Sequence, residues 1–182
     1  AGRRADGVAR APLRAQAMSG EGEPPRFLVD HMVAKLGTYL RILGCDAAVD
    51  TTVRTHELIR RANREGRVFL TRNTRLADQY PRADRVLVLA ETDPVLQLRR
   101  VVGEFRLDPE ARMFSRCIRC NVPLAELAAL GDLAERVPAA VRARHRRFWR
   151  CPACGTVFWH GTHVRNTRRK LGYREEDATR SQ

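Results

Sequence analysis

The stretch RFLVDHMVAKLGTYLRILG, residues 26–44, decides the fold that the sequence predicts. Residues 26–30 form a short apolar run, suited to a buried strand, that ends on Asp30. From 31 to 43 the apolar residues recur at helical spacing, and Gly44 is a natural helix stop. A strand that leads directly into a helix is the unit from which parallel α/β sheets are built.

The same alternation of strand and helix continues to residue 105. We expect further strands at 45–49, 68–71 and 85–90, and helices at 56–65, 74–79 and 93–105. Thr55 is expected to cap the helix at 56–65, and Thr92 or Asp93 the last one. The short connections predict an α/β fold, in which helices flank a parallel sheet.

Composition favours a globular protein with a polyanionic partner. The chain has 182 residues, enough for one domain and a small module, and 43% of them are hydrophobic. Its net charge of +13 favours nucleic acid as the partner. Residues 115–182 hold 14 Arg or Lys against 6 Asp or Glu, so the C-terminal part should bind the anion.

The sequence predicts neither export nor a membrane span. No apolar run approaches the roughly 18 residues of a transmembrane helix. Residues 1–20 lack the apolar stretch of a secretory signal, and residues 1–25 are expected to form a disordered extension. We therefore expect a cytoplasmic protein with no membrane partner. Met18 is a candidate for the true start of the chain.

Two CxxC pairs predict a structural metal site. Cys117 and Cys120 form one pair, Cys151 and Cys154 the other, and 30 residues separate them. Two such turns supply the tetrahedral sulfur shell that Zn²⁺ prefers. Disulfides would not suit a reducing cytosol, and a redox CxxC needs no second copy. We expect a helix at 123–145 between the pairs and a buried, unpartnered thiol at Cys45.

Polar residues follow the predicted strands at one edge of the sheet. Asp30 ends the first strand, Glu57 opens the second helix, and Asn73 follows the strand at 68–71 within RVFLTRNTRL, residues 67–76. The carboxyl ends of parallel strands share an edge, so these residues can converge. Oxygen ligands there would hold Mg²⁺ or Mn²⁺. A helix N-cap explains Asp30 equally well.

Aromatic and basic residues surround the second CxxC pair. Most of the aromatic residues, Phe148, Trp149, Phe158 and Trp159, are expected to pack against the metal site. His160 and His163 are expected at the surface or in contact with nucleic acid, not as metal ligands. For contact with RNA phosphates we expect the arginines Arg72, Arg146, Arg147, Arg150, Arg165, Arg168 and Arg169.

Five stretches resemble a known family, the Mut-seven C-terminal ribonuclease domain. They are FLVDHMVAKLGTYLRILGCD (27–46), HELIRRANREGRVFLTRN (56–73), DPVLQLRRVV (93–102), SRCIRCNVPL (115–124) and FWRCPACGTVFWHGTH (148–163). The resemblance implies a PIN-like domain fused to a zinc ribbon. We expect the PIN-like domain at 26–106, a linker at 107–114, the zinc ribbon at 115–171 and a flexible tail at 172–182.

The resemblance also implies metal-dependent RNA cleavage, with departures at the acidic positions. Asp30 matches the acid of the family's first strand, but the family typically has LTRD where this chain has LTRN, which ends on Asn73. Acids are also typical where Thr55 and His56 stand, and only Glu57 remains acidic there. An amide can ligate Mg²⁺, but it brings no charge and cannot act as a base.

The sequence thus predicts an RNA-interacting, metal-dependent endoribonuclease with a weakened acidic site and a basic zinc ribbon. Its cofactors would be structural Zn²⁺ and catalytic Mg²⁺ or Mn²⁺. The alternative is a catalytically inactive module that binds RNA or docks on a ribonucleoprotein. A third possibility is an interaction protein, antitoxin-like or scaffold-like, that uses the PIN-like surface.

Overall fold

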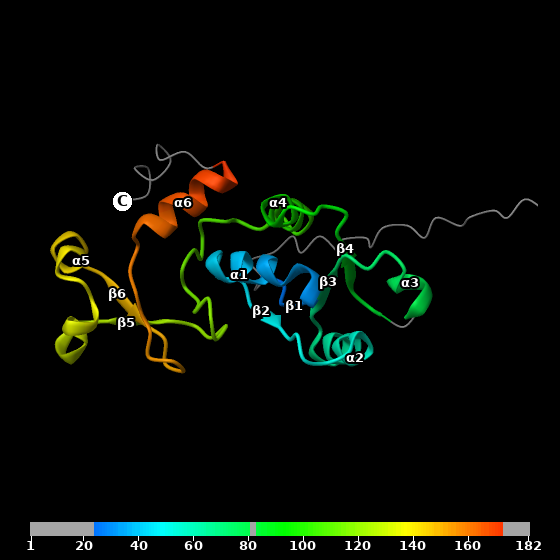
Figure 1. The fold of residues 1–182 in the computed structure, drawn as a ribbon, viewed down its shortest axis with the longest axis horizontal. Helices are drawn as coiled ribbons and strands as arrows, with labels where there is room; N and C mark the ends of the chain where they lie inside the picture. Colours follow the sequence, from blue (N-terminus) through cyan, green and yellow to red (C-terminus); the bar gives the residue numbers. More distant parts are fainter. Residues whose placement is uncertain (1–23, 81–82, 173–182) are drawn as a thin grey trace, which may run out of the picture.

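The first part of the chain folds around a four-stranded parallel sheet (Figure 1). The computed structural model describes residues 24–80 and 83–172. The strand order is β2-β1-β3-β4, and each strand runs parallel to its neighbours. All four predicted strands are present, namely β1 (Phe27–Val29), β2 (Ala47–Val49), β3 (Val68–Thr71) and β4 (Val86–Val88).

Helices cover both faces of this sheet, so the expected α/β class is confirmed. The 3₁₀ turn η1 (His31–Val33) leads into α1 (Ala34–Ile42), which lies on the same face as α4 (Pro94–Glu104). The opposite face carries α2 (Thr55–Glu65) and the short α3 (Leu76–Gln79).

Side chains that alternate along the strands form two cores. Phe27 and Val29 of β1 point toward α1 and α4, while Leu28 between them packs against α2. This is the period-two alternation of a strand that is buried on both faces. Cys45 is 4% exposed in the first core, and burial raises its pKa to about 11. The prediction of a buried thiol at this position is confirmed.

Two helix starts differ from the expectation. The segment predicted as a helix from residue 31 begins as the turn η1, which Asp30 caps by accepting a hydrogen bond from the N–H of Met32. Thr55 is the first residue of α2, not its cap. Asp93 caps α4 as predicted and accepts hydrogen bonds from Val95 and Leu96.

The C-terminal module is a three-stranded antiparallel sheet, and the helix predicted at 123–145 is wrong. The order is β5-β6-β7, with β5 (Ala125–Leu127), β6 (Phe148–Arg150) and β7 (Val157–Phe158). Between β5 and β6 the chain forms the 3₁₀ helix η2 (Gly131–Arg136) and α5 (Ala139–Arg144). Gly131 has φ +47° and Pro138 caps α5, so neither residue lies inside a continuous helix.

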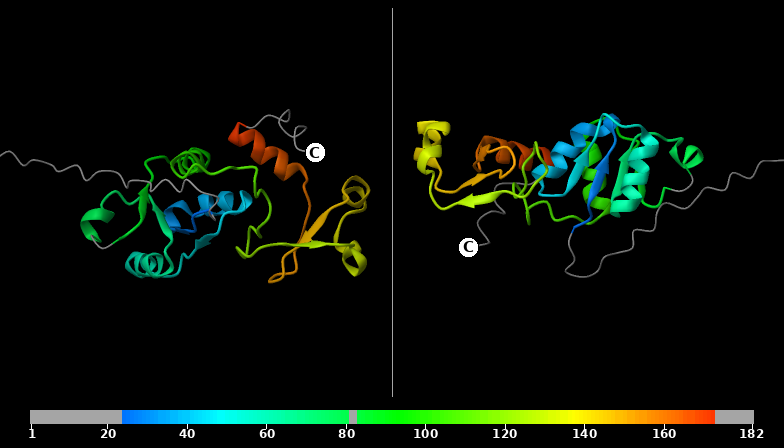
Figure 2. Two further views of the ribbon diagram at one scale, coloured as in Figure 1. Left: turned by 180° about the vertical axis from the view of Figure 1, so that it is seen from behind. Right: turned by 90° about the horizontal axis from the view of Figure 1, so that it is seen from below.

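The last helix, α6 (Thr162–Leu171), returns to the α/β domain and was not predicted. It packs beside α4 (Figure 2), and Arg99 of α4 donates to the backbone carbonyl of Lys170 (3.0 Å). The segment 107–114 also lies against the first core, through Leu107 and Met113. Both contacts tie the C-terminal half of the chain to the sheet.

Most of the predicted N-terminal extension and C-terminal tail lies outside the described residues. Within the described part, no helix has the length and apolarity needed to cross a bilayer.

Candidate functional site

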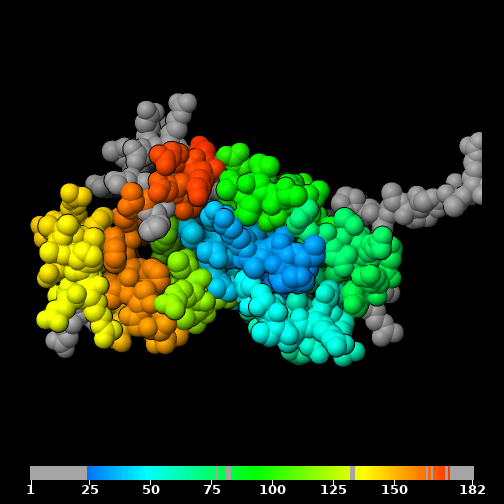
Figure 3. Space-filling view, viewed as in Figure 1, coloured from blue at the N-terminus to red at the C-terminus, as the bar shows by residue number. Residues whose placement is uncertain are grey.

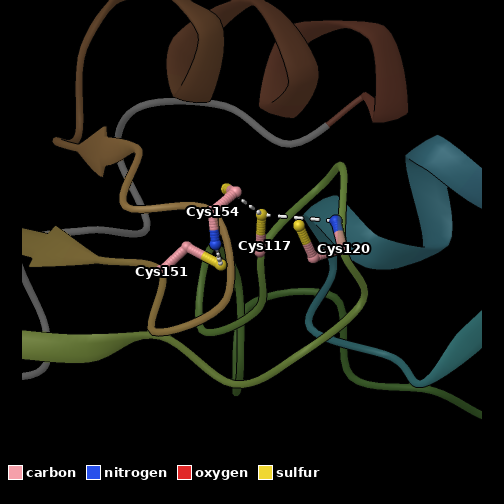
Figure 4. A group of neighbouring side chains, drawn as sticks. All are labelled: Cys117, Cys120, Cys151 and Cys154. Atoms are coloured by element: carbon pink, nitrogen blue, oxygen red, sulfur yellow. Dashed lines mark hydrogen bonds between the residues drawn. The ribbon is translucent and has the colours of Figure 1, made fainter.

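The four predicted cysteine ligands meet between two loops (Figure 4). The sulfur atoms of Cys117, Cys120, Cys151 and Cys154 all lie within 4.8 Å of one another. The Sγ atoms of Cys117 and Cys154 are 3.9 Å apart. Zinc–sulfur bonds of about 2.3 Å in a tetrahedron place the sulfurs about 3.8 Å apart. The cluster therefore fits a metal ion such as zinc.

The two cysteine loops share one backbone design. In each, the N–H of the second cysteine donates to the Sγ of the first, at 3.4 Å. The residue after each pair has a left-handed backbone, with φ 60° at Asn121 and φ 70° at Gly155. Glycine and asparagine are the residues that adopt this conformation most readily. The sequence analysis did not single out Asn121.

Neighbouring groups shift the pKa values of the cysteines in opposite directions. Hydrogen bonds with Thr156 lower the pKa of Cys154 to about 6. A hydrogen bond with Cys154 raises the pKa of Cys120 to about 12. Metal binding requires thiolates, so a bound ion would displace the remaining protons.

The first cysteine loop also closes the free edge of the parallel sheet at β2. Ala47, the first residue of β2, donates its N–H to Oδ1 of Asn121 (3.0 Å). Its carbonyl accepts Nε–H of Arg41 (2.8 Å), and Nη1 of Arg41 donates to the carbonyls of Ile118 and Arg119 (3.0 Å each). Unpaired edge groups invite association with other strands. The loop of the metal site here occupies that edge.

Asp46 extends this contact into the sheet. Asn121 donates to its Oδ1 (2.7 Å), and Arg67 donates to Oδ1 and Oδ2 (2.7 and 3.1 Å). Burial raises the pKa of Asp46, but these hydrogen bonds lower it more, so the net value is below the usual range. Figure 3 shows the yellow-green segment, which carries the first loop, in contact with both the orange loop and the blue-cyan domain.

A second polar group lies at the end of β1 and β3. Asp30 is 1% exposed, and its Oδ2 accepts the hydroxyl of Thr71 (2.6 Å). Its Oδ1 accepts the N–H of Met32 (3.3 Å) and lies 2.6 Å from Nδ1 of His31. A carboxylate offers about four acceptor positions. These contacts use three of the four.

Thr71 joins Asp30 to Asn73. The N–H of Asn73 donates to Oγ1 of Thr71 (3.1 Å). The Asn73 amide is used locally: Oδ1 accepts the N–H of Arg75 (3.0 Å) and Nδ2 donates to Oε1 of Gln79 (3.2 Å). The structure thus links two of the three candidate ligands through a buried threonine that the sequence analysis did not single out.

Glu57, the third candidate, lies in the first turn of α2. Its side chain is 51% exposed and lies 3.8 Å from Nε2 of His56. Within residues 24–80 and 83–172, no hydrogen bond joins Glu57 to Asp30 or Asn73.

Unmatched polar atoms gather where β3 and β4 end. In the described residues Nε of Arg72, Oε2 of Glu91 and Oε1 of Gln97 are buried without a hydrogen-bond partner. Arg72 follows β3 and Glu91 follows β4, its neighbour in the sheet. Buried polar atoms without partners are rare in proteins, so this corner has capacity for a ligand.

The predicted RNA-binding arginines of the C-terminal module differ in their surroundings. Glu126 holds Arg147 through two hydrogen bonds (2.7 and 2.9 Å), and Glu110 pairs with Arg168 (3.1 Å). The side chain of Arg165 lies outside the described residues. Arg146, Arg147, Arg150 and Arg169 of the predicted set are exposed, and of these only Arg147 is paired with a carboxylate in the described residues.

The protein thus combines a parallel α/β sheet that has a buried acid at a strand end with a four-cysteine ribbon. Residues 25–171 match the Mut7-C RNAse domain family, so the chain belongs to this family and has an RNA-related role. The resemblance seen in the sequence is confirmed. No curated protein and no solved structure matches the chain.

Proposed function

We propose that the protein is a metal-dependent endoribonuclease with a weakened acidic site, and that its basic ribbon helps to hold RNA. The observation that carries the proposal is the Asp30 carboxylate, which is buried at the end of β1 and hydrogen-bonded to Thr71. It lies in a chain whose residues 25–171 match a ribonuclease family.

The oxygen ligands at this edge suit Mg²⁺ or Mn²⁺. Asp30 and Glu57 would supply the charge, and Asn73 a neutral oxygen. A bound ion would orient a water molecule and neutralise the scissile phosphate. Thr71 holds the Asp30 carboxylate in one orientation through its hydroxyl. The four cysteines would hold Zn²⁺ as a structural ion.

The second candidate function is an RNA-binding module without catalysis. The hydrogen bonds of the Asn73 side chain favour this second function, because both ends of the amide are already bonded to neighbouring residues and not free for a metal ion. Glu57 is exposed and joined to neither of the other two ligands.

Cleavage of a labelled single-stranded RNA in Mn²⁺ separates the two functions. We expect wild type to cleave, Asp30→Asn to lose at least about tenfold in rate, and Asn73→Asp to gain. Asp93→Asn is the matched control, because asparagine caps a helix as well as aspartate does and should leave the rate unchanged. Intact RNA after incubation with wild type, despite tight binding, would establish the second function.

A further inference from the structure

A cavity of about 290 Å³ opens in the ribbon, away from the sheet edge. It lies where α5 ends and β6 begins, and Figure 1 shows α5 and α3 at opposite ends of the molecule. Six residues line it: Arg144, His145, Arg146, Arg147, Trp149 and His160. Neither the metal site nor the candidate ligands at the sheet edge use these side chains.

The cavity is positively charged. Arg144 and Arg146 are exposed, and neither forms an ion pair with a carboxylate in the described part of the chain. Arg147 is paired with Glu126, which fixes its guanidinium and offsets its charge. Two arginines are therefore free to bind an anion such as a phosphodiester.

One wall of the cavity is aromatic. The rings of Trp149 and His160 are stacked, with centroids 4.5 Å apart and planes 17° apart. Partial burial lowers the pKa of His160, and the nearby Arg147, Arg168 and His145 lower it further. The guanidinium of Arg147 lies 5.4 Å from the centroid of the Trp149 ring, and Phe114 lies 5.8 Å from His160 at a tilt of 55°. His160 is nevertheless exposed, so a further ring would have to pack against His160 and the uncovered edge of Trp149.

Packing around the metal does not account for Trp149. Successive residues of a strand point to opposite faces, and on β6 it is Phe148 that is buried, at 6% exposure. Trp149 is only partly buried and borders the cavity. The prediction that most of the aromatic residues near the second CxxC pair pack against the metal site therefore suits Phe148 better than Trp149.

We propose that this cavity binds one unpaired nucleotide of a single-stranded RNA, with its base against Trp149 and His160 and its phosphate against Arg144 and Arg146. The inference rests on the proposed function, which identifies RNA as the ligand. Proteins read unpaired RNA bases by stacking them on aromatic side chains, while duplex bases are inaccessible. The volume lies near the lower end for small-ligand sites, which suits a single nucleotide.

The location of the cavity predicts a dependence on RNA length. An RNA held at α5 and cut near α3 has to extend along the molecule (Figure 1). Short oligonucleotides would fill the cavity without reaching the sheet edge. We expect a 20-nucleotide RNA to bind more tightly than a 4-nucleotide RNA.

Charge reversal at the cavity tests its phosphate contacts. The assay is fluorescence anisotropy of a labelled 20-nucleotide single-stranded RNA, with metal-loaded protein and no added Mg²⁺ or Mn²⁺. Arg144→Glu and Arg146→Glu should each weaken binding about five- to tenfold and reduce the salt slope by about 1. Arg142→Glu is the matched control, since it makes the same charge change on α5 outside the cavity. It should weaken binding less than about twofold.

Tryptophan fluorescence tests the stacking. The protein has two tryptophans, so Trp159→Phe leaves Trp149 as the reporter and Trp149→Phe leaves Trp159. Single-stranded RNA should quench the first variant and leave the second nearly unchanged.

Three outcomes would overturn the cavity proposal while leaving the proposed function intact, provided that wild type binds RNA. They are equal weakening by Arg142→Glu and Arg144→Glu, quenching of Trp159 alone, and duplex RNA that binds as tightly as a single strand. Absence of any RNA binding by wild type would overturn both the cavity and the proposed function. Cleavage by Arg144→Glu that is slower at low RNA concentration but reaches the wild-type rate at saturating RNA would support the cavity as a binding site separate from the catalytic residues.

Discussion

Two regions of the parallel sheet differ in how completely their polar groups are hydrogen-bonded. We call them the β2 border, which is the free edge of the sheet at β2, and the open border, which is where β3 and β4 end. At the β2 edge both outward-facing groups of Ala47 are hydrogen-bonded, and Asp46 receives three hydrogen bonds. Where β3 and β4 end, Arg72 and Glu91 keep buried atoms without partners. The loop of the cysteine cluster completes the first border, whereas nothing in the described residues completes the second. The proposed ligand site lies at the second border, so stability and the proposed ligand binding would depend on different parts of one sheet.

The largest effect should follow from loss of the metal. Cys151→Ser removes a ligand on the second loop, which does not contact β2. Structural zinc supplies about 10–16 kcal/mol of apparent binding energy in small domains, so we expect several kcal/mol of destabilisation. Hydrogen exchange at the Ala47 amide should also become faster, because the loop that covers it is no longer held.

Cys45→Ala is the control for this experiment, since it removes a buried thiol that is not a metal ligand. It should lower stability but keep about one zinc per chain. Less than about half a zinc per wild-type chain would argue against the four-sulfur site. Unchanged exchange at Ala47 in Cys151→Ser would show that the β2 border does not depend on the metal.

The sequence predicted the elements with local signatures but not the contacts between them. The CxxC spacing indicated the cysteine cluster, and apolar periodicity indicated the four strands. The β2 border depends on Arg41 and Asn121, which contact residues 74 to 78 positions away and match no local pattern. The basic helix α6 was missed because few of its residues are apolar. Among its side chains that the structure describes, Val164 and Thr167 are the buried ones.

The candidate site at the sheet edge was also predictable only in part, because local sequence patterns indicate where strands end but not which side chains contact one another there. Strand ends placed Asp30 and Asn73 on neighbouring strands, which follows from parallel pairing of β1 and β3. The hydroxyl of Thr71 that joins them is a matter of side-chain rotamer, and no spacing rule indicates it.

The next largest effect is expected at Gly44, where α1 ends beside the C-terminal half of the chain. Gly44 has φ +80°, and a Cβ there would overlap the backbone carbonyl of Arg112. Left-handed backbone costs a non-glycine residue about 1–2 kcal/mol, and overpacking adds about 1–3 kcal/mol. Gly44→Ala should thus lower the free energy of unfolding in urea by about 2–5 kcal/mol. Gly66→Ala is the control, since Gly66 has φ +63° but no atom within 4 Å of its Cβ, and should cost only the backbone part.

A smaller loss is expected when the side-chain bonds at the β2 border are removed. Asn121→Ala deletes the acceptor of the Ala47 N–H and a donor to Asp46. Leaving such groups unpaired costs about 1–3 kcal/mol. Asn121→Gly separates backbone from side chain, because glycine tolerates φ 60° and loses only the hydrogen bonds. If urea unfolding shows Asn121→Gly to be as stable as wild type, these bonds do not hold the border.

The smallest change in stability is expected for Asn73→Asp. This variant also gives the clearest test of whether the border where β3 and β4 end binds a cation. Its carboxylate can still accept the N–H of Arg75, and the amide of Gln79 can rotate to donate to it. The free energy of unfolding in urea should therefore change by less than about 0.5 kcal/mol, whereas Asn73→Ala should lose about 1 kcal/mol with its hydrogen bonds. Mn²⁺, titrated by calorimetry into zinc-loaded protein, should bind Asn73→Asp more tightly than wild type, because the variant adds a charge near Asp30. Equal Mn²⁺ affinity in the two proteins would mean that this border does not bind a cation, and the buried Asp30 would then serve only to cap η1.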